Sequence, residues 1–231
     1  MHFLLQIVLG VVFTDILIAF FHWLEDTYFT YCMNIPVLGF IAKDNELHHY
    51  FPRTIVSVPY IYSCTVTLPL ALMTILTIYL FSPKFFKDNK YFIGVVVVLG
   101  TLSNILHKFN HMRSCECPTV IRALYKMGVL VGDVHHKSHH EDPTTKYGVV
   151  LPVTNYALDS IGFWRMLEAL IHAFTGLEPS HKLAYTPYVE AVGKTQNHIG
   201  ANLACPPVAS KGELNMLREK LSAHYACPMT Q

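Results

Sequence analysis

The chain has 231 residues, of which 52% are hydrophobic and 14% are charged, against about 25% charged residues in ordinary soluble domains. This deficit of charge indicates a membrane protein and argues against a soluble enzyme. The formal net charge of +1 argues against a large basic surface, so we expect no nucleic acid partner.

Three apolar segments predict membrane spans. Residues 3–21 are long enough to cross a bilayer, for which a helix needs about 20 apolar residues. They lack a preceding Lys or Arg and a following small-x-small site, so a span is favoured over a cleaved signal peptide. Residues 55–81 form a second span and residues 91–106 a shorter third one, with a tight polar loop at 82–90 between them. A carboxylate is costly in lipid, so we expect Asp15 to face protein.

The segments after residue 118 are less apolar. Residues 119–134 carry Arg122 and Lys126, and residues 147–164 are interrupted by Pro152, Asn155 and Asp159. We expect both segments to lie along the membrane interface or to pack on the helices. Whether 119–134 or 147–172 crosses the membrane stays open. The fold class is therefore all-α, a multi-pass membrane helical bundle.

We expect a membrane-embedded domain over residues 1–178 and a polar C-terminal tail over residues 179–231. Ser210 and Glu213 have the spacing of a capping box and predict one short surface helix in the tail. Its apolar face would carry Leu214, Leu217 and Leu221.

The six cysteines follow no C-x-x-C spacing. Four of them sit in or beside apolar or histidine-rich stretches, so we expect free thiols in a reducing setting. Cys115 and Cys117 lie near His111, which leaves a soft-metal site as a weaker alternative.

Nine histidines gather where the predicted spans end. With three crossings, the first span ends on one face, the second leaves from it and the third returns to it. All nine therefore reach the same membrane face, and the loop on the opposite face has none. They are His22, His48, His49, His107, His111, His135, His136, His139 and His140.

Several of these side chains are three or four residues apart and so share one helix face. They are His22 with Asp26, His107 with His111, His135 with His139, and the set His136, His139 and His140. Nine imidazoles and one carboxylate exceed the usual four ligands of one zinc ion and suit two metal ions, iron included. The alternative is a set of hydrogen-bonded histidines without metal. The other five stand outside the pattern: His2, His172, His181, His198 and His224.

A histidine-rich dimetal site at a membrane face suits oxygen chemistry on an aliphatic chain. Acid–base side chains cannot break an unactivated C–H bond, whereas reduced iron with O2 supplies an oxidant. A metal transporter is an alternative of another class. Transport predicts polar ligands near the bilayer midplane, and these histidines sit at span ends.

Seven motifs occur in a fixed order: FHWLEDTYF, PVLG, LHHYFPRTI, HKFNH, HHKSHH, NYALD and IGFWRMLE. Together, over about residues 20–178, they resemble the Kua-type lipid desaturase family. The resemblance implies a membrane-embedded diiron enzyme that uses O2 and two externally supplied electrons. At the matching positions it assigns metal-ligand roles to eight histidines: His22, His48, His49, His107, His111, His136, His139 and His140. Asp26 and His135 would be further ligands or supporting residues.

The family has two branches, animal plasmanylethanolamine desaturases and the plant chloroplast phosphatidylglycerol desaturase. HHYFPRTI and KMGVLV look like the plant form, whereas IGFWRMLE and the doubled His135–His136 look like the animal form. Thr144 stands where animal members carry a histidine, and VSVPYIYS replaces their Asp-rich segment. We expect a vinyl-ether, plasmalogen-forming desaturase. The alternatives are an acyl-chain desaturase of the plant type and a lipid hydroxylase on the same scaffold.

The resemblance implies one of two reactions: oxidation beside the ether oxygen of an alkyl chain, or oxidation near the carboxyl end of an acyl chain. Both act close to the lipid head group, which matches a site at span ends. The resemblance implies a membrane lipid substrate and an electron donor, either a b-type cytochrome with its reductase or a ferredoxin. Lys and Arg near span ends favour the cytosolic side, so we expect an endoplasmic reticulum protein with a cytosol-facing site. The histidine face carries Lys43, Arg53, Lys108, Arg113, Arg122 and Lys126, against Lys84, Lys87 and Lys90 on the other face.

Overall fold

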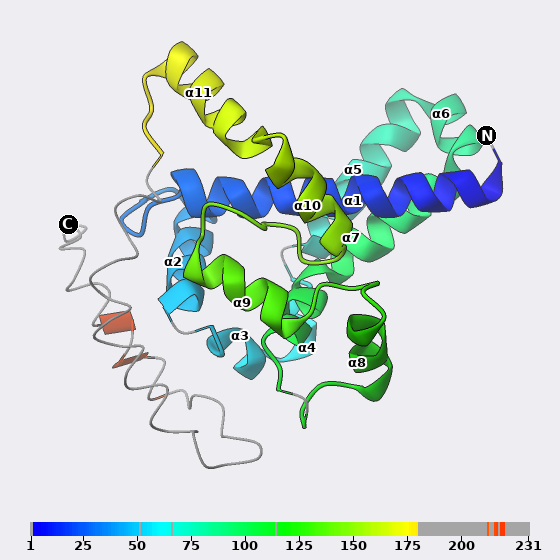
Figure 1. Cartoon of the computed structure of the whole chain (residues 1–231). Coiled ribbons are helices and arrows are strands. Elements are labelled where there is room, and N and C mark those ends of the chain that lie inside the picture. The colour runs from blue at the N-terminus through cyan, green and yellow to red at the C-terminus, as the bar shows by residue number, and fades with distance from the viewer. Residues whose placement is uncertain are drawn as a thin grey trace.

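The computed structural model describes most of the predicted membrane domain and a few residues of the tail. The described residues are 2–50, 52–65, 67–113 and 115–179, with Gly212, Asn215, Met216, Arg218 and Glu219. In this part of the chain all regular secondary structure is α-helical, as predicted (Figure 1). The capping box and leucine face expected for the tail helix fall outside the described residues.

Two helices in the described part of the chain are long and apolar enough to cross a membrane. They are α1 (Phe3–Tyr28) and α7 (Lys90–Asn110), with 26 and 21 residues. Only 28% and 22% of their most apolar windows are buried inside the protein, whereas a core helix of a soluble protein would be mostly buried. Their exposed apolar side chains suit contact with lipid. These helices correspond to the first and third predicted spans.

The predicted span over residues 55–81 is not one continuous helix. The segment divides into α3 (Thr54–Ser57), α4 (Tyr60–Ser63) and α5 (Thr67–Phe81). Pro59 lacks a backbone N–H, and a helix rarely continues through the residue before a proline. Val58 is accordingly extended, and α4 begins directly after Pro59. The remaining apolar helix, α5, has 15 residues, so alone it is shorter than the about 20 that a bilayer crossing needs.

The polar linker between the second and third segments is also more regular than predicted. Residues 82–90 contain the helix α6 (Pro83–Asp88) in place of a loop. Pro83 is the first residue of α6, a position where proline is tolerated because no helical hydrogen bond is lost. The linker therefore turns the chain from α5 into α7 through a short helix.

Helices α1 and α7 run side by side in the same direction. Gln6 ties their starts together, because its Oε1 accepts the N–H groups of Tyr91 and Phe92 at 3.2 and 3.3 Å. The helices also approach closely at Gly10, where a Cβ would lie 2.9 Å from the Cβ of Val95. Helix α5 packs along α7. In chain order it lies between α1 and α7, and it leads the chain back to the start of α7. The histidine-bearing ends of α1 and α7 thus lie together, as the three-crossing topology predicted.

The remaining helices cover this end of the molecule (Figure 1). Each is too short to cross a bilayer singly, so the described structure gives no single crossing helix within residues 119–134 or 147–172. Their bounds are α2 (Leu38–Tyr50), α8 (Thr119–Lys126), α9 (Asp133–Glu141), α10 (Pro152–Ser160) and α11 (Phe163–Thr175).

An aromatic cluster fixes α11 and the loop before α10 against α1. Trp23 of α1 stacks on Trp164 of α11 with ring centroids 5.7 Å apart, and Tyr147 meets Trp164 edge-on at 5.0 Å. These three rings are almost fully buried. Asp15 is also buried, and its two carboxylate oxygens accept the backbone N–H groups of residues 150 and 151 at 3.1 and 3.2 Å. The expectation that Asp15 faces protein is confirmed.

The cysteines differ from the expectation of free thiols. Cys64 and Cys117 are free, as predicted. Cys32 and Cys115 are disulfide-bonded, so the prediction is wrong at these two positions. Cysteine spacing alone gives no connectivity.

Candidate metal centre

Four helices bring eight of the nine predicted histidines and Asp26 into two compact groups. Helices α1, α2 and α7 contribute side chains from their C-terminal ends, and α9 contributes three histidines. Within each group the candidate ligand atoms all lie within 4.8 Å of one another. The five-histidine group is His48, His107, His111, His136 and His140, and the Asp26 group is His22, Asp26, His49 and His139.

The five-histidine group is built around His107. Its Nε2 lies 3.1 Å from Nε2 of His48, 2.8 Å from that of His136 and 3.3 Å from that of His111. His140 joins through its Nε2, 3.3 Å from that of His136. The same ring nitrogen of each of the five side chains thus takes part in the group.

Hydrogen bonds alone cannot satisfy this arrangement. An imidazole nitrogen carries either one N–H or one lone pair, so Nε2 of His107 cannot bond to three neighbouring nitrogens at once. Two nitrogens each about 2.1 Å from one ion are about 3.0–3.4 Å apart at coordination angles of 90–109°. The observed separations of 2.8 to 3.3 Å are close to this range. The donor set therefore fits a metal cation.

The Asp26 group has a carboxylate at its centre. Oδ1 of Asp26 lies 2.9 Å from Nε2 of His49, and Oδ2 lies 3.5 and 3.2 Å from Nε2 of His22 and His139. Although buried, the Oδ2 atom and the Nε2 atoms of His22 and His139 have no aligned hydrogen-bond partner among the described residues. Buried polar atoms without partners are costly, and a bound cation would relieve that cost.

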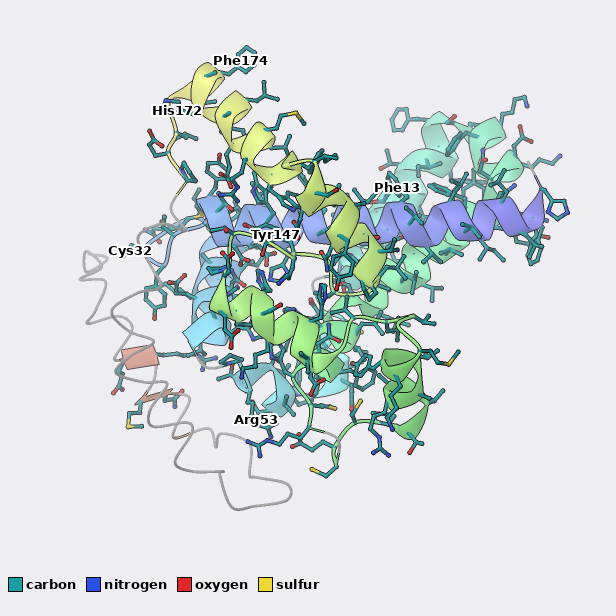
Figure 2. The ribbon with its side chains drawn as sticks, in the orientation of Figure 1. Phe13, Cys32, Arg53, Tyr147, His172 and Phe174 are labelled. Atoms are coloured by element: carbon teal, nitrogen blue, oxygen red, sulfur yellow. The ribbon has the colours of Figure 1, made fainter. Side chains whose placement is uncertain are left out.

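Backbone carbonyls orient two of the imidazoles. Nδ1 of His22 donates to the carbonyl of Tyr147 at 2.9 Å, and Nδ1 of His139 donates to the carbonyl of Thr145 at 2.7 Å. With the proton held on Nδ1, the Nε2 lone pair of each ring faces the carboxylate of Asp26. In Figure 2 Tyr147 lies between α1 and α9. The loop between α9 and α10 is thus a structural part of the site.

The two groups are neighbours. The His22 ring centroid lies 5.2 Å from that of His107, and the centroids of His49 and His140 are 4.6 Å apart. His136 and His139, one from each group, are adjacent on α9 and fully buried. The structure therefore offers two adjacent sets of candidate metal ligands.

The electrostatics keep most of these imidazoles neutral. Burial first, and then the neighbouring imidazoles, hold the pKa well below its ordinary value at His48, His111, His136 and His140. Burial would also lower the pKa of His49, but the adjacent Asp26 carboxylate outweighs it and raises this pKa. Neutral imidazoles present the lone pairs that a metal ion needs.

His135 is not part of either group, although it precedes His136 directly. Its Nε2 accepts a hydrogen bond from Nδ2 of Asn155 at 3.0 Å, and the side chain is half-buried. His172 is also remote, because it lies on α11 in an ion pair with Glu178 (Figure 2). His2 is exposed near the chain start, and the other three histidines outside the pattern fall beyond the described residues.

A family model described as the lipid desaturase domain matches residues 11–182. The match covers well over half of the chain and includes both histidine groups. This chain belongs to the lipid desaturase family. The Kua-type resemblance seen in the motifs is thereby confirmed, and the protein is an oxidoreductase.

Desaturases from distant organisms are similar to this chain. A probable fatty acid desaturase of Acanthamoeba polyphaga mimivirus is 29% identical over 77% of this chain and 86% of the relative. Plasmanylethanolamine desaturase 1 of Mus musculus is 32% identical over 76% of this chain and 67% of the relative. The chloroplastic fatty acid desaturase 4-like 1 of Arabidopsis thaliana is 27% identical over 74% of this chain and 57% of the relative. No solved structure shows a significant match.

Two residues of this desaturase have a role that the sequence did not suggest. Asn155 and Asp159, interpreted as interruptions of an apolar segment, hold the loop that orients His22 and His139. Asn155 bonds both the N–H and the carbonyl of Gly148, at 2.7 and 2.8 Å. Asp159 accepts the N–H of residue 146 at 3.2 Å. Their spacing of four residues in the NYALD motif, which places both on one helix face, was the available signal.

Proposed function

We propose that this lipid desaturase holds two iron ions, one in each group, and oxidises a lipid chain near its head group. The observation that carries the proposal is the pair of adjacent groups of convergent ligands at the ends of apolar helices. Imidazole and carboxylate ligands suit iron. The reaction converts a CH2–CH2 unit, O2, two electrons and two protons into a CH=CH unit and two waters.

When bound, the iron ions would supply with O2 the oxidising power that side chains lack. The protein's own part is to hold the ligands in place and to exclude water. The carbonyls of Thr145 and Tyr147 fix two imidazoles in one tautomer, and the complete burial of His136 and His139 keeps solvent from the centre of the site. A dry site protects the oxidation from side reactions.

The depth of the site supports a product close to the head group. Both groups include residues from the last turns of the membrane-spanning helices, such as His107 near the end of α7. The end of a span lies about 15 Å from the bilayer centre. The first few carbons of a lipid chain reach this level, whereas mid-chain carbons lie deeper.

The relatives support vinyl-ether formation, the chemistry that yields plasmalogens. The mouse relative and a 27% identical relative from Myxococcus xanthus are both plasmanylethanolamine desaturases. We therefore propose that an alkyl chain is oxidised beside its ether oxygen. Because a chloroplastic fatty acid desaturase is also similar, oxidation of an acyl chain near its carboxyl end is the second candidate.

Lipid mass spectrometry of a desaturase-null cell that expresses the protein tests this proposal. We expect acid-labile vinyl-ether lipids to appear. A new double bond near the carboxyl end of an acyl chain would favour the second candidate, and a hydroxylated chain would indicate a hydroxylase. A double bond in the middle of an acyl chain would refute both proposed products.

We propose that the histidine side faces the cytosol, with electrons from a b-type cytochrome and its reductase or from a ferredoxin. The excess of Lys and Arg on this side supports that orientation in the endoplasmic reticulum. Cys32 and Cys115 lie on the same side and are disulfide-bonded, so a lumenal orientation is the second candidate. A glycosylation acceptor engineered into residues 82–90 should be modified, and one at residues 43–46 should not. The reverse pattern would place the site in the lumen.

A further inference from the structure

A pocket of about 220 Å³ lies beside the five-histidine group. Its wall comes from residues 52–53 before α3, from residues 110–113 at the end of α7, and from one side of α9. Two candidate metal ligands, His111 and His140, form part of that wall. A molecule in the pocket therefore contacts the proposed iron site directly.

Charged side chains line this pocket. Three are cations and one is a carboxylate: Arg53, Arg113, Lys137 and Asp133. Arg113 and Lys137 are exposed, whereas the two histidines are more buried, so the cations stand nearer to solvent than the imidazoles do. Asp133 lies in the first turn of α9, where a carboxylate is favourable beside the positive end of the helix dipole. The pocket thus combines a positive outer part with an imidazole wall.

The three cations are not equivalent. Arg53 forms a two-point ion pair with Glu116, at 2.9 and 2.8 Å, and also donates to the carbonyl of His111 at 3.3 Å. It fixes the segment that carries His111. Among the described residues Lys137 has a 3.6 Å contact with Glu141 across exposed side chains, and such surface pairs are weak. Arg113 is exposed, and its hydrogen bond to Oε2 of Glu116 at 2.9 Å comes from its backbone N–H. Arg113 and Lys137 are therefore the cations that can turn to a ligand.

The pocket lies at the level of lipid head groups. Helix α7 has 21 residues, and at about 1.5 Å per residue it spans about 31 Å, close to the thickness of the hydrocarbon core. The pocket residues 110–113 follow directly at its end. A lipid whose chain enters the site would carry its phosphate at this level.

We propose that Arg113 and Lys137 bind the phosphate of the substrate's head group and so place the first carbons of its chain beside the five-histidine group. This inference rests on the proposed function, since it takes a phospholipid as the substrate. Arg and Lys are the usual partners of phosphate oxygens, through charge-assisted hydrogen bonds. Only the glycerol and its linkage separate that phosphate from the first chain carbons, so anchoring the phosphate restricts which carbons reach the irons.

An acidic patch on the electron donor is the other partner that such cations attract. The concave shape favours the lipid, because a protein donor contacts a broad surface, whereas this pocket has a volume of about 220 Å³ and an imidazole wall. A head-group phosphate fits inside such a volume.

The test uses the detergent-purified holoenzyme and two lipids with the same short 1-alkyl-2-acyl chains, one with a phosphoethanolamine head group and one without phosphate. Binding is measured by native mass spectrometry, and KM and kcat are measured with saturating electron donor. The variant is Arg113→Gln with Lys137→Gln. The control, Lys43→Gln with Lys126→Gln, removes two exposed charges from the same side outside the pocket.

We expect the variant to weaken phospholipid binding and raise its KM about tenfold for each lost charge-assisted hydrogen bond. Its kcat should also fall, because the chain of a bound lipid is no longer held beside the five-histidine group. Variant and wild type should bind the phosphate-free lipid equally. Added inorganic phosphate should not raise the turnover of the phosphate-free lipid, because free phosphate does not anchor the chain. Equal phospholipid binding by variant and wild type, or a rise only in the requirement for electron donor, would overturn the proposal. If the wild type binds phospholipid but converts neither lipid, the proposed function fails and the binding comparison still decides this inference.

Discussion

Replacing His139 by alanine tests the two-ion interpretation, and the same change at His135 on the same helix is the matched control. The His139 ring is fully buried, and its Nε2 lies 3.2 Å from Oδ2 of Asp26 in a group of four ligands. Its loss leaves three ligands in that group and all five in the other. We expect the iron content to fall from about two ions per chain to about one.

The effect on turnover should exceed the loss caused by a supporting contact. Removing a group that only orients a ligand typically costs about 10–100-fold, so we expect His139→Ala to lower turnover by more than about 100-fold. His135→Ala should keep the wild-type iron content and lose at most the about 10–100-fold of a supporting contact, because His135 bonds Asn155 next to the loop and belongs to neither group. Iron is measured by elemental mass spectrometry and helicity by circular dichroism. Full iron content in a folded His139→Ala, or equal losses at both positions, would refute the reasoning.

Three further predictions follow from the structure. Asp15→Ala leaves one buried and one part-buried backbone N–H group without an acceptor, so we expect the free energy of unfolding to fall by about 2–3 kcal/mol, as measured by thermal unfolding. Gly10→Ala should cost about 1–3 kcal/mol, because the new Cβ would lie 2.9 Å from Val95; Gly100→Ala, with open space around it, should be neutral or stabilising. In the metal-free protein the histidines with lowered pKa stay neutral when folded and bind protons when unfolded. Its melting temperature should therefore be constant above about pH 6.5 and fall below it, and iron should shift that fall to lower pH.

Topology and spacing explain why the sequence could predict which side chains the structure brings together. Histidines that follow or precede apolar spans must meet at one face, whatever the details of the packing. Spacings of three and four residues then fix which side of each helix they occupy, as for His22 and Asp26. Neither argument needs the tertiary structure. For the same reason they did not separate His135 from its neighbour His136, since only the packing of α9 decides which ring turns inward.

The prediction of one continuous helix over residues 55–81 was wrong because hydropathy does not account for the backbone constraints of proline. Residues 55–81 are apolar throughout, but Pro59 ends one short helix and begins another. Pro69 is accommodated because it lies in the first turn of α5. The prolines were visible in the sequence, and giving them more weight than hydropathy would have predicted the break.

The contacts that orient the ligands are beyond sequence reasoning for a different reason. The acceptors for His22 and His139 are backbone carbonyls, which every residue has, so no residue type marks them. Their positions depend on the loop between α9 and α10, held by side chains distant in sequence. Asp15, 135 residues before Val150, bonds that loop at one end, and Asn155 bonds it near its middle. A buried carboxylate in the first span therefore acts on the metal site through the loop, so loosening the loop should disturb the Asp26 group before it affects the five-histidine group.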